Sequence, residues 1–276
     1  MPWHAELALD YTHEAGRSVA RFLHKGPLRV LHSLYPEGDA ICHNVLVHPP
    51  AGLVGGDTLA LTVQVATGAH GLVTTPGATR FYRSEGAPAL QHTRLQLAAG
   101  ARFEWLPLET LCYSGCIAEN RLELALAPGA ECMGWDVTAL GLPGAGQPFA
   151  DGSLLLHTEL PGVWLERGHV RARDTRLLHS PLGLAGKHCM ATLYFAAGSP
   201  LARNRRDAAL DCARQVLAGN ALETTAGATS PNPQVVVVRV LAPMVEPAMA
   251  VLRPVWQAWR AHFWGLQAPL PRTWKL

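Results

Sequence analysis

The sequence lacks a clear excess of charge of either sign. Of its 276 residues, 23 are Lys or Arg and 21 are Asp or Glu, which leaves a formal net charge of +2. Proteins that follow a phosphate backbone usually gather basic residues on one face. The densest basic cluster holds only Arg203, Arg205 and Arg206, so we expect no nucleic-acid partner.

Long apolar segments are also missing. No run of 18 apolar residues could span a membrane, so we expect no membrane partner. The first residues, MPWHAELALD, include acids and no apolar core of a signal peptide. The cysteines are scattered rather than spaced as a disulfide framework, at Cys42, Cys112, Cys116, Cys132, Cys189 and Cys212. These features predict a cytoplasmic protein with reduced thiols.

Recognised catalytic and nucleotide-binding motifs are absent as well. The glycine turn Gly52–Asp57 is followed by Thr58, and it lacks the Lys-Ser/Thr pair that a phosphate loop requires. Neither G-x-S-x-G nor H-E-x-x-H occurs. We therefore expect no enzymatic activity. One alternative stays open, a metal-dependent hydrolase that uses Asp57 with His48 or His43.

Metal-ligand spacing is similarly weak. Cys112 and Cys116 form one C-x3-C pair, whereas structural zinc sites usually combine two such pairs. This favours two small buried thiols near a turn. His43 and His48 are five residues apart on a predicted strand, which places them on opposite faces. The sequence therefore predicts no tightly bound metal or other cofactor.

What the sequence does contain is a period-two pattern from residue 3 to about 195. Leu59, Leu61, Val63 and Val65 alternate with small or polar residues, and Phe103 and Trp105 alternate with Arg102 and Glu104. Such alternation predicts strands with one buried face. Charged residues make up only 16% and hydrophobic residues 49%, so we expect a large core and an apolar surface that a partner could cover.

A weak repeat accompanies these strands. The pairs Gly68-Ala69, Gly100-Ala101 and Gly129-Ala130 follow one another at intervals of 32 and 29 residues, each between two apolar-alternating segments. Regular self-similarity favours stacked β-coils or a layered sandwich over a simple meander. A common hairpin turn in an alanine-rich protein would explain the same pairs.

The pattern changes in the last quarter of the chain. Apolar spacing predicts amphipathic helices over residues 202–218 and 244–264, and Pro254 should kink or split the second. Between them we expect a loop over 221–233 and a buried strand from Val235 to Leu241. The sequence thus predicts a single domain over residues 1–276, with a β body at about 1–200 and a helix-containing part at about 201–276.

Four acidic residues lie in or beside apolar segments, where a lone carboxylate would be costly to desolvate. They are Asp57, Glu109, Asp136 and Glu166. Each could be paired with an arginine or lie on the solvent-exposed face of its strand. Alternatively, together they could form a polar path through an apolar body.

Several long motifs, in order along nearly the whole chain, resemble the UreD family of urease accessory proteins. They are GPLRV at 26–30, YPEG at 35–38, HPPAGLVGGD at 48–57, TTPGATRFYRS at 74–84, WLPLET at 105–110, LGLP at 140–143 and PRTW at 271–274. Ser114 departs from the pattern, because the family often has an aspartate there.

The resemblance implies a mostly β, layered or β-helix-like coil of many short strands, with two α-helices near the C-terminus. It implies a scaffold and metallochaperone that binds the urease structural subunits together with UreF and UreG. Nickel would be a transient cargo that passes through an internal tunnel, and we carry the tunnel role to Asp57, Glu109, Asp136 and Glu166. A purely structural interaction protein without a metal path is the remaining alternative.

The C-terminal helices are the candidate surface for UreF. Their large apolar residues, Met244, Met249, Trp256, Trp259, Phe263 and Trp264, exceed what one helix stripe is expected to bury. Aromatic residues and methionine are favoured at protein interfaces. Ordinary packing against the β body would account for the same residues.

Overall fold

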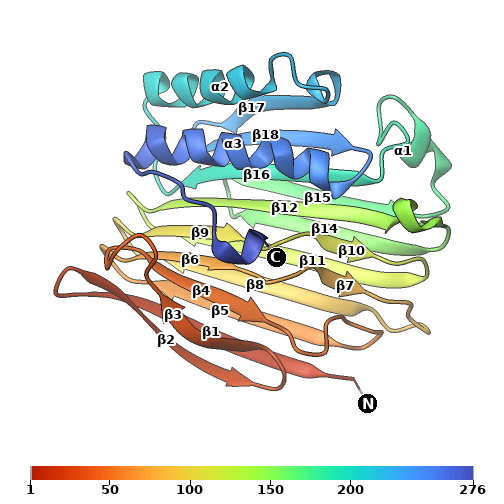
Figure 1. The fold of residues 1–276 in the computed structure, drawn as a ribbon, viewed down its shortest axis with the longest axis horizontal. Helices are drawn as coiled ribbons and strands as arrows, with labels where there is room; N and C mark the ends of the chain where they lie inside the picture. The colour runs from red at the N-terminus through yellow and green to blue at the C-terminus, as the bar shows by residue number, and fades with distance from the viewer. Residues whose placement is uncertain (1, 276) are drawn as a thin grey trace.

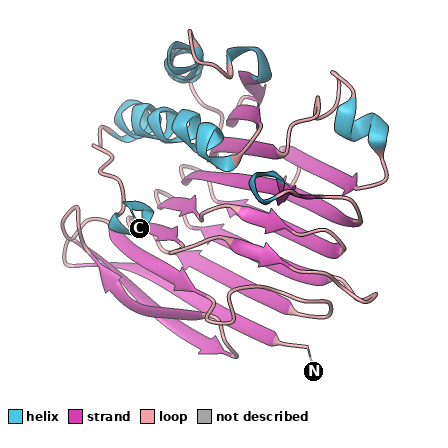
Figure 2. Ribbon diagram, turned by 45° about the vertical axis from the view of Figure 1, so that its right-hand side comes forward, coloured by secondary structure: helices cyan, strands magenta, loops and turns pink. Residues whose placement is uncertain are grey.

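The computed structural model describes residues 2–275, which form two β-sheets stacked face to face and a layer of helices over one of them (Figures 1 and 2). Sheet 1 has seven strands, in the order β15 (Trp164–Arg171), β14 (Gly152–Leu160), β11 (Cys116–Leu126), β8 (Ala89–Leu97), β5 (Thr58–Val65), β1 (His4–Glu14) and β2 (Arg17–Lys25).

Sheet 2 has eleven strands within the same residues. Its main path runs through β17 (Ala226–Asn232), β18 (Val235–Ala242), β16 (Cys189–Ala197), β12 (Glu131–Leu142), β9 (Arg102–Leu106), β6 (His70–Thr74), β4 (Cys42–Val47) and β3 (Arg29–Leu34). The short strands β7 (Thr79–Phe81), β10 (Thr110–Cys112) and β13 (Gln147–Pro148) are attached through β12 or through each other.

The middle of the chain coils between the two sheets. Strands β5, β8 and β11 pair in parallel in sheet 1, and β6, β9 and β12 pair in parallel in sheet 2. The chain therefore climbs from one end of the molecule to the other, as the colour sequence of Figure 1 shows. This arrangement confirms the predicted β-helix-like coil.

The Gly-Ala pairs form one corner of each coil. Gly68, Gly100 and Gly129 have φ values of +76°, +71° and +80°, which glycine adopts without strain. Each following alanine donates its N–H to the carbonyl three residues earlier, at 3.0, 3.0 and 2.9 Å, which closes a β-turn. The alanines are buried. The repeat is therefore a stacked turn that carries the chain from sheet 1 to sheet 2.

Three α-helices occur in the described residues: α1 (Thr175–His179), α2 (Arg203–Leu217) and α3 (Val245–Trp264). Short 3-10 turns are η1 (Pro143–Ala145), η2 (Glu223–Thr225) and η3 (Arg272–Lys275). The two predicted C-terminal helices are confirmed, and α1 was not expected. Helix α3 continues through Pro254, so the prediction of a split is wrong. Its buried face, packed on sheet 2, holds the helix together despite the missing N–H donor.

The predicted loop over 221–233 is also wrong. The segment contains η2 and the strand β17, which pairs only with β18 at the edge of sheet 2. Gly227 and Pro231 lie in this strand, and such residues are tolerated at a sheet edge. The predicted strand next to it is confirmed as β18.

Two hydrophobic cores result from this layering. One lies between the sheets and includes Leu9, Val63 and Leu124, and the other lies between sheet 2 and the helices and includes Trp135 and Val251. Sheet 2 is thus covered on both faces over β9, β12, β16 and β18. The expectation of one buried face is wrong for β9, where Glu104 is buried as completely as its neighbours.

The aromatic residues of α3 belong to the second core. Met249, Trp256, Trp259, Phe263 and Trp264 are buried against the chain's own sheet, and Met244 alone of the predicted group is exposed, at 45%. The expectation that these side chains exceed what one helix stripe can bury is therefore wrong for all but Met244. Any partner of these helices would meet their outward, more polar faces.

None of the helices in residues 2–275 combines the length and the apolar character that crossing a membrane requires.

Candidate functional site

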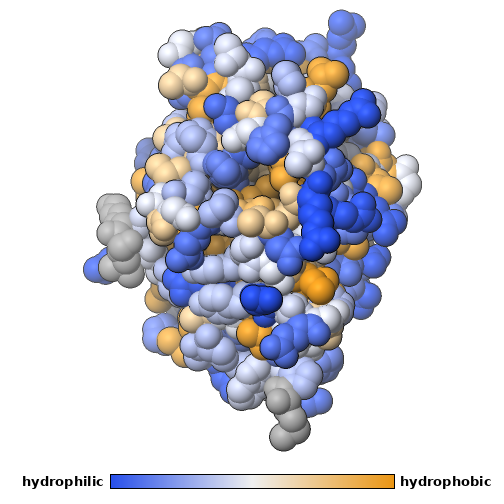
Figure 3. Space-filling model, turned by 90° about the vertical axis from the view of Figure 1, so that its right-hand side faces the viewer, coloured by the Kyte–Doolittle hydropathy of each residue, from blue (hydrophilic) through white to orange (hydrophobic). Residues whose placement is uncertain are grey.

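A cavity of about 880 Å³ lies between the two sheets, near the end of the coil where β14 and β15 face β16 and β18. Leu177 and Leu184, in and after α1, close part of its side. Figure 3 shows the face of the molecule on the α1 side, where a hollow with hydrophobic residues inside is bordered mainly by hydrophilic ones. A deep, partly apolar cavity with a few polar groups is the usual form of a small-ligand site.

The period-two geometry of the strands brings polar side chains into this cavity. On sheet 2, Asp136, Thr192 and Arg239 are register partners on the adjacent strands β12, β16 and β18. On sheet 1, Asn120 and Glu166 line the opposite wall. Because neighbouring side chains on β12 face the helix core instead, Asp136 is the acid that this strand presents to the cavity.

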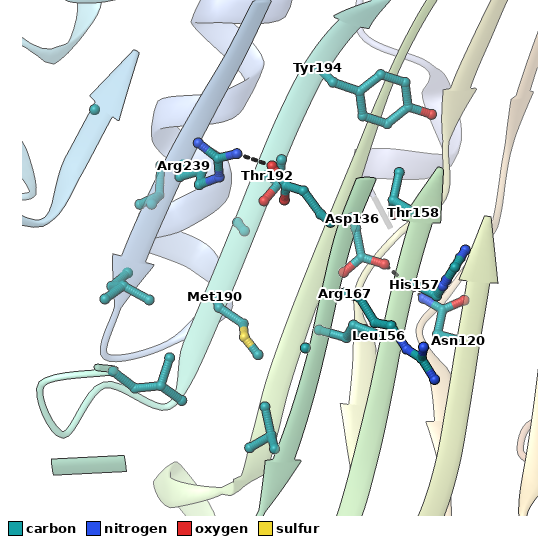
Figure 4. A pocket seen from close by; sticks show the side chains of 18 of the residues that line it. Asn120, Asp136, Leu156, His157, Thr158, Arg167, Met190, Thr192, Tyr194 and Arg239 are labelled. Carbon is teal, nitrogen blue, oxygen red and sulfur yellow. Dashed lines mark hydrogen bonds and ion pairs between the residues drawn. The ribbon is translucent and has the colours of Figure 1, made fainter. Parts of the chain in front are cut away.

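Asp136 is held by neutral donors. Its Oδ2 accepts a hydrogen bond from Asn120 Nδ2 at 2.7 Å (Figure 4). Its Oδ1 accepts one from Thr138 Oγ1 at 2.8 Å. Burial raises the pKa of Asp136, and these two hydrogen bonds offset the rise only in part. No positively charged side chain of the described residues forms an ion pair with it. The cavity therefore contains a carboxylate without a matching cation.

Glu166 has the opposite environment. Arg239 Nη2 donates to its Oε1, and Trp164 Nε1 donates to the same oxygen at 3.2 Å. Arg239 also donates from Nη1 to Thr229 Oγ1 at 3.3 Å. Burial lowers the pKa of Arg239. The charge of Glu166 is thus already matched inside the chain.

Two further features of the cavity are a buried tyrosine, Tyr194, and a smaller cavity that adjoins it. Tyr194 lines the cavity, is 1% exposed, and its hydroxyl has no hydrogen-bond partner among the described residues. That hydroxyl lies over Gly134, where a Cβ would come within 2.4 Å of it. A smaller cavity of about 20 Å³ shares Asn120, Leu122 and Asp136 with the large one. Asp136 therefore lies between the two spaces.

Asp57, which was predicted to share the path, has a structural role. It is 2% exposed, and its Oδ1 and Oδ2 accept the backbone N–H groups of Trp3 at 2.7 Å and Val54 at 2.9 Å. These bonds join the start of the chain to the glycine turn. Asp57 lines neither of the two cavities described above.

Glu109 also lies outside the lining of both cavities. Its carbonyl accepts the Thr79 N–H at 2.9 Å, just before β10. The pKa of Cys189 is raised to about 12. Burial is the main cause, and the negative charges of Glu109, Asp136 and Glu246 add to it. The structure therefore brings Asp136 and Glu166 to one cavity and leaves Asp57 and Glu109 apart from it.

The other candidate ligands do not assemble either. His43 Nε2 lies 2.8 Å from Glu37 Oε1, and the carboxylate oxygens of Asp57 bind backbone amides. Cys112 and Cys116 are both fully buried, and all six cysteines, which lie within the described residues, are free. In residues 2–275 no group of three or more His, Cys, Asp or Glu side chains is placed to hold a metal ion.

A buried ionic cluster under α3 was not predicted from the sequence. Arg260 donates to both Glu104 (Nε to Oε1, 3.2 Å) and Glu37 (Nη1 to Oε2, 2.8 Å). His70 Nε2 lies 2.9 Å from Glu104 Oε1, and Trp256 Nε1 donates to Glu104 Oε2 at 2.8 Å. Arg260 and Glu104 are both 0% exposed. One signal was available, because Arg260 falls four residues after Trp256 on the apolar stripe of the helix.

The pKa shifts in this cluster reflect a balance between burial and the partners of each group. Burial alone would raise the pKa of Glu104, but the hydrogen bond from His70 and the charge of Arg260 together hold it below its usual range. The same balance lowers the pKa of Glu37. Burial lowers the pKa of His70 despite Glu104 beside it. The cluster is therefore a set of satisfied charges that fastens α3 to sheet 2.

Comparison with known proteins assigns the chain to a family. A family model described as UreD urease accessory protein matches residues 4–275. The urease accessory protein UreD of Polaromonas naphthalenivorans (strain CJ2) is 68% identical over 276 residues, 100% of both chains. This chain belongs to the UreD family of urease accessory proteins. UreD of Paracidovorax citrulli (strain AAC00-1) is 67% identical over 276 residues, and UreD of Leptothrix cholodnii is 53% identical over 277 residues, each covering 100% of both chains.

Membership of the UreD family confirms the resemblance found in the motifs and the role of a urease accessory protein. The departure at Ser114 has a local structural use. Its Oγ accepts the backbone N–H of Asp151 at 3.1 Å, at the turn between β10 and β11.

Proposed function

We propose that this chain is a non-enzymatic cytoplasmic scaffold that passes Ni²⁺ through the inter-sheet cavity during urease maturation. In this proposal it acts with UreF and UreG on the urease structural subunits, and the nickel is a transient cargo. The observation that supports the path is Asp136, an acid that faces the inter-sheet cavity with only neutral donors bound to it. An unmatched anion in a cavity is a place for a mobile cation.

The ligand chemistry suits transit rather than storage. Ni²⁺ stands near the top of the affinity order of divalent ions, so clustered imidazoles and thiolates would hold it tightly. The cavity offers carboxylate, amide and hydroxyl oxygens from residues such as Asp136, Asn120 and Thr192. Water would fill the remaining coordination positions. Such a site binds an ion and also lets it leave.

We retain α2 and α3 as the UreF-facing surface. The support is their place as an outer layer over sheet 2 (Figure 2), with Arg203, Asn204, Asp211 and Arg214 exposed on α2. Because the apolar side of α3 is packed on the sheet, a partner here would bind polar and charged side chains. This replaces the aromatic surface that the sequence suggested.

The hydrolase alternative has little support, because Asp57 and His43 are bound to other groups of the chain. An interaction protein without a metal path remains the second candidate. Asp136→Asn separates it from the first, since the substitution keeps the size of the side chain and removes its charge.

The test is maturation of the urease apoprotein by the complete set of accessory proteins. With Asp136→Asn we expect normal complex assembly and a loss of urease activation of about tenfold or more, as is typical when a metal site loses one of its groups. Glu123→Gln, on the solvent face of sheet 1, is the matched control and should activate normally. Full activation with Asp136→Asn would contradict the metal path and favour the purely structural role.

A further inference from the structure

The two acids of the cavity differ in what balances their charge. Asp136 is bound only by Asn120 and Thr138, whereas Glu166 is bound by the guanidinium of Arg239. A cation that arrives at Asp136 therefore meets no fixed positive group at that acid. The same cation cannot bind Glu166 while Arg239 occupies it.

We propose that Arg239 is a charge gate, which keeps Glu166 closed to the cargo cation until its ion pair with Glu166 opens. The proposal rests on the proposed passage of Ni²⁺ through the cavity and adds a residue that controls it. In this proposal the ion first binds Asp136. It can bind Glu166 only after the ion pair between Arg239 and Glu166 has opened.

The strand register places the two positions close together. Asp136 pairs with Thr192, and Thr192 pairs with Arg239, so the acid and the arginine lie two strands apart on one face of sheet 2. Two strand spacings amount to about 10 Å. Figure 4 shows Arg239 and Asp136 on the same side of the cavity, with Thr192 between them. An ion can thus move from one acid to the other within this single cavity.

Both members of the pair keep a partner when the pair opens. Arg239 Nη1 donates to Thr229 Oγ1 on β17, and Trp164 Nε1 donates to Glu166. Opening the pair therefore leaves neither group without a hydrogen bond. An entering ion would replace the guanidinium at Glu166, and the guanidinium would stay on the Thr229 side.

Exposure indicates that this pair can open. The Arg239 and Glu166 side chains are 46% and 29% exposed, whereas those of Arg260 and Glu104 are both 0% exposed. Solvent screens the charges of a partly exposed pair and weakens it. The Arg260 pair has no such access. Of these two arginines, Arg239 is therefore the one suited to move.

The experiment is equilibrium dialysis of the full-length chain against Ni²⁺. Asp136→Asn should weaken binding, whereas Glu166→Gln alone should leave it unchanged, because Arg239 already occupies that acid. Arg239→Met should tighten binding about tenfold by freeing a carboxylate. Adding Glu166→Gln to Arg239→Met should remove that gain, and Arg239→Lys, which keeps the charge, should bind as the unchanged chain does.

Arg94→Met is the matched control, because it removes an ion pair with Glu123 (2.9 Å) from the solvent face of sheet 1. It should not alter Ni²⁺ binding. If the Arg239→Met chain does not fold, Glu166→Gln still tests the proposal. A loss of Ni²⁺ binding as large as that caused by Asp136→Asn would overturn the gate. If Arg239→Met leaves Ni²⁺ binding unchanged while Asp136→Asn weakens it, the gate is overturned but the nickel path is not. If Asp136→Asn also leaves Ni²⁺ binding unchanged, the nickel path itself is overturned.

Discussion

Two regions on opposite faces of sheet 2 each hold an acidic side chain, and they surround it differently. Under α3, Glu104 is 0% exposed, receives hydrogen bonds from Arg260 and Trp256, and lies beside His70. Between the sheets, Asp136 receives two neutral hydrogen bonds and faces a cavity of about 880 Å³. Both acids come from central strands of sheet 2.

This contrast distinguishes an acid that stabilises the fold from an acid that could bind a passing cation. A buried carboxylate that is matched by fixed cations and donors joins two layers of the fold, and nothing further can bind it. A carboxylate that faces space without a matching cation is costly to ionise, and a mobile cation would relieve that cost. Burial of an acid alone therefore does not identify a metal path; the neighbours of the acid do.

The largest effect is expected from Arg260→Met. It leaves Glu104 and Glu37 buried without their shared cation, and breaking a buried pair costs about 3–5 kcal/mol of the free energy of unfolding. Urea unfolding followed by circular dichroism measures this change. Arg94→Met, in a partly exposed pair, should cost less than about 1 kcal/mol. If the two substitutions lower the free energy of unfolding equally, the buried cluster under α3 is no more important to stability than a partly exposed ion pair.

Acid should weaken the α3 region next. The pKa of His70 lies below its usual 6.5, so the stability that neutral His70 contributes is complete above pH 6.5 and declines below it. The pKa values of Glu104 and Glu37 lie below 4.5, so their contribution is complete above pH 4.5 and is lost as pH falls through the lowered values. Thermal unfolding at a series of pH values should show Tm falling below pH 6.5, and more steeply below pH 4.5. A Tm that rises over this range would contradict the assignment.

The smallest effect is expected from Asp136→Asn on stability. Because the folded chain raises the pKa of Asp136, ionisation of this acid disfavours folding once the pH exceeds its usual pKa of 3.8. Removing the charge should therefore leave the urea midpoint at pH 7 unchanged or slightly higher. The same midpoint for Glu104→Gln should fall. A clear loss of stability with Asp136→Asn would place Asp136 among the structural acids.

Much of the fold could be predicted because its signals are local. The period-two runs and the Gly-Ala turns each need only a few neighbouring residues to act, and they produced the coil as expected. Strand β17 was missed because its Gly, Ser, Thr and Pro residues resemble a loop, and pairing with β18 decides its structure. Glu104 was assigned to an open face because the helix that covers it is more than 150 residues away along the chain.

Of the candidate site, the sequence predicted two acids, Asp136 and Glu166, but not their other neighbours or their arrangement. Asp136 and Glu166 were chosen, together with Asp57 and Glu109, because all four lie in or beside apolar segments, and the resemblance supplied their tunnel role. No local pattern separated the two pairs. Their separation depends on which strand faces which cavity. Arg239, which lies 73 residues from Glu166 in sequence, could be connected with it only through the packing of β18 opposite β15.

The link between Glu37 and Arg260 also has a consequence for the order in which the protein forms. The two residues are 223 positions apart, and α3 is among the last elements to be synthesised. Until α3 leaves the ribosome, Leu72, Leu106, Trp135 and Leu193 of sheet 2 have no helix to cover them. Sheet 2 therefore presents an apolar face that is fully covered only once α3 and the later Trp274 pack against it.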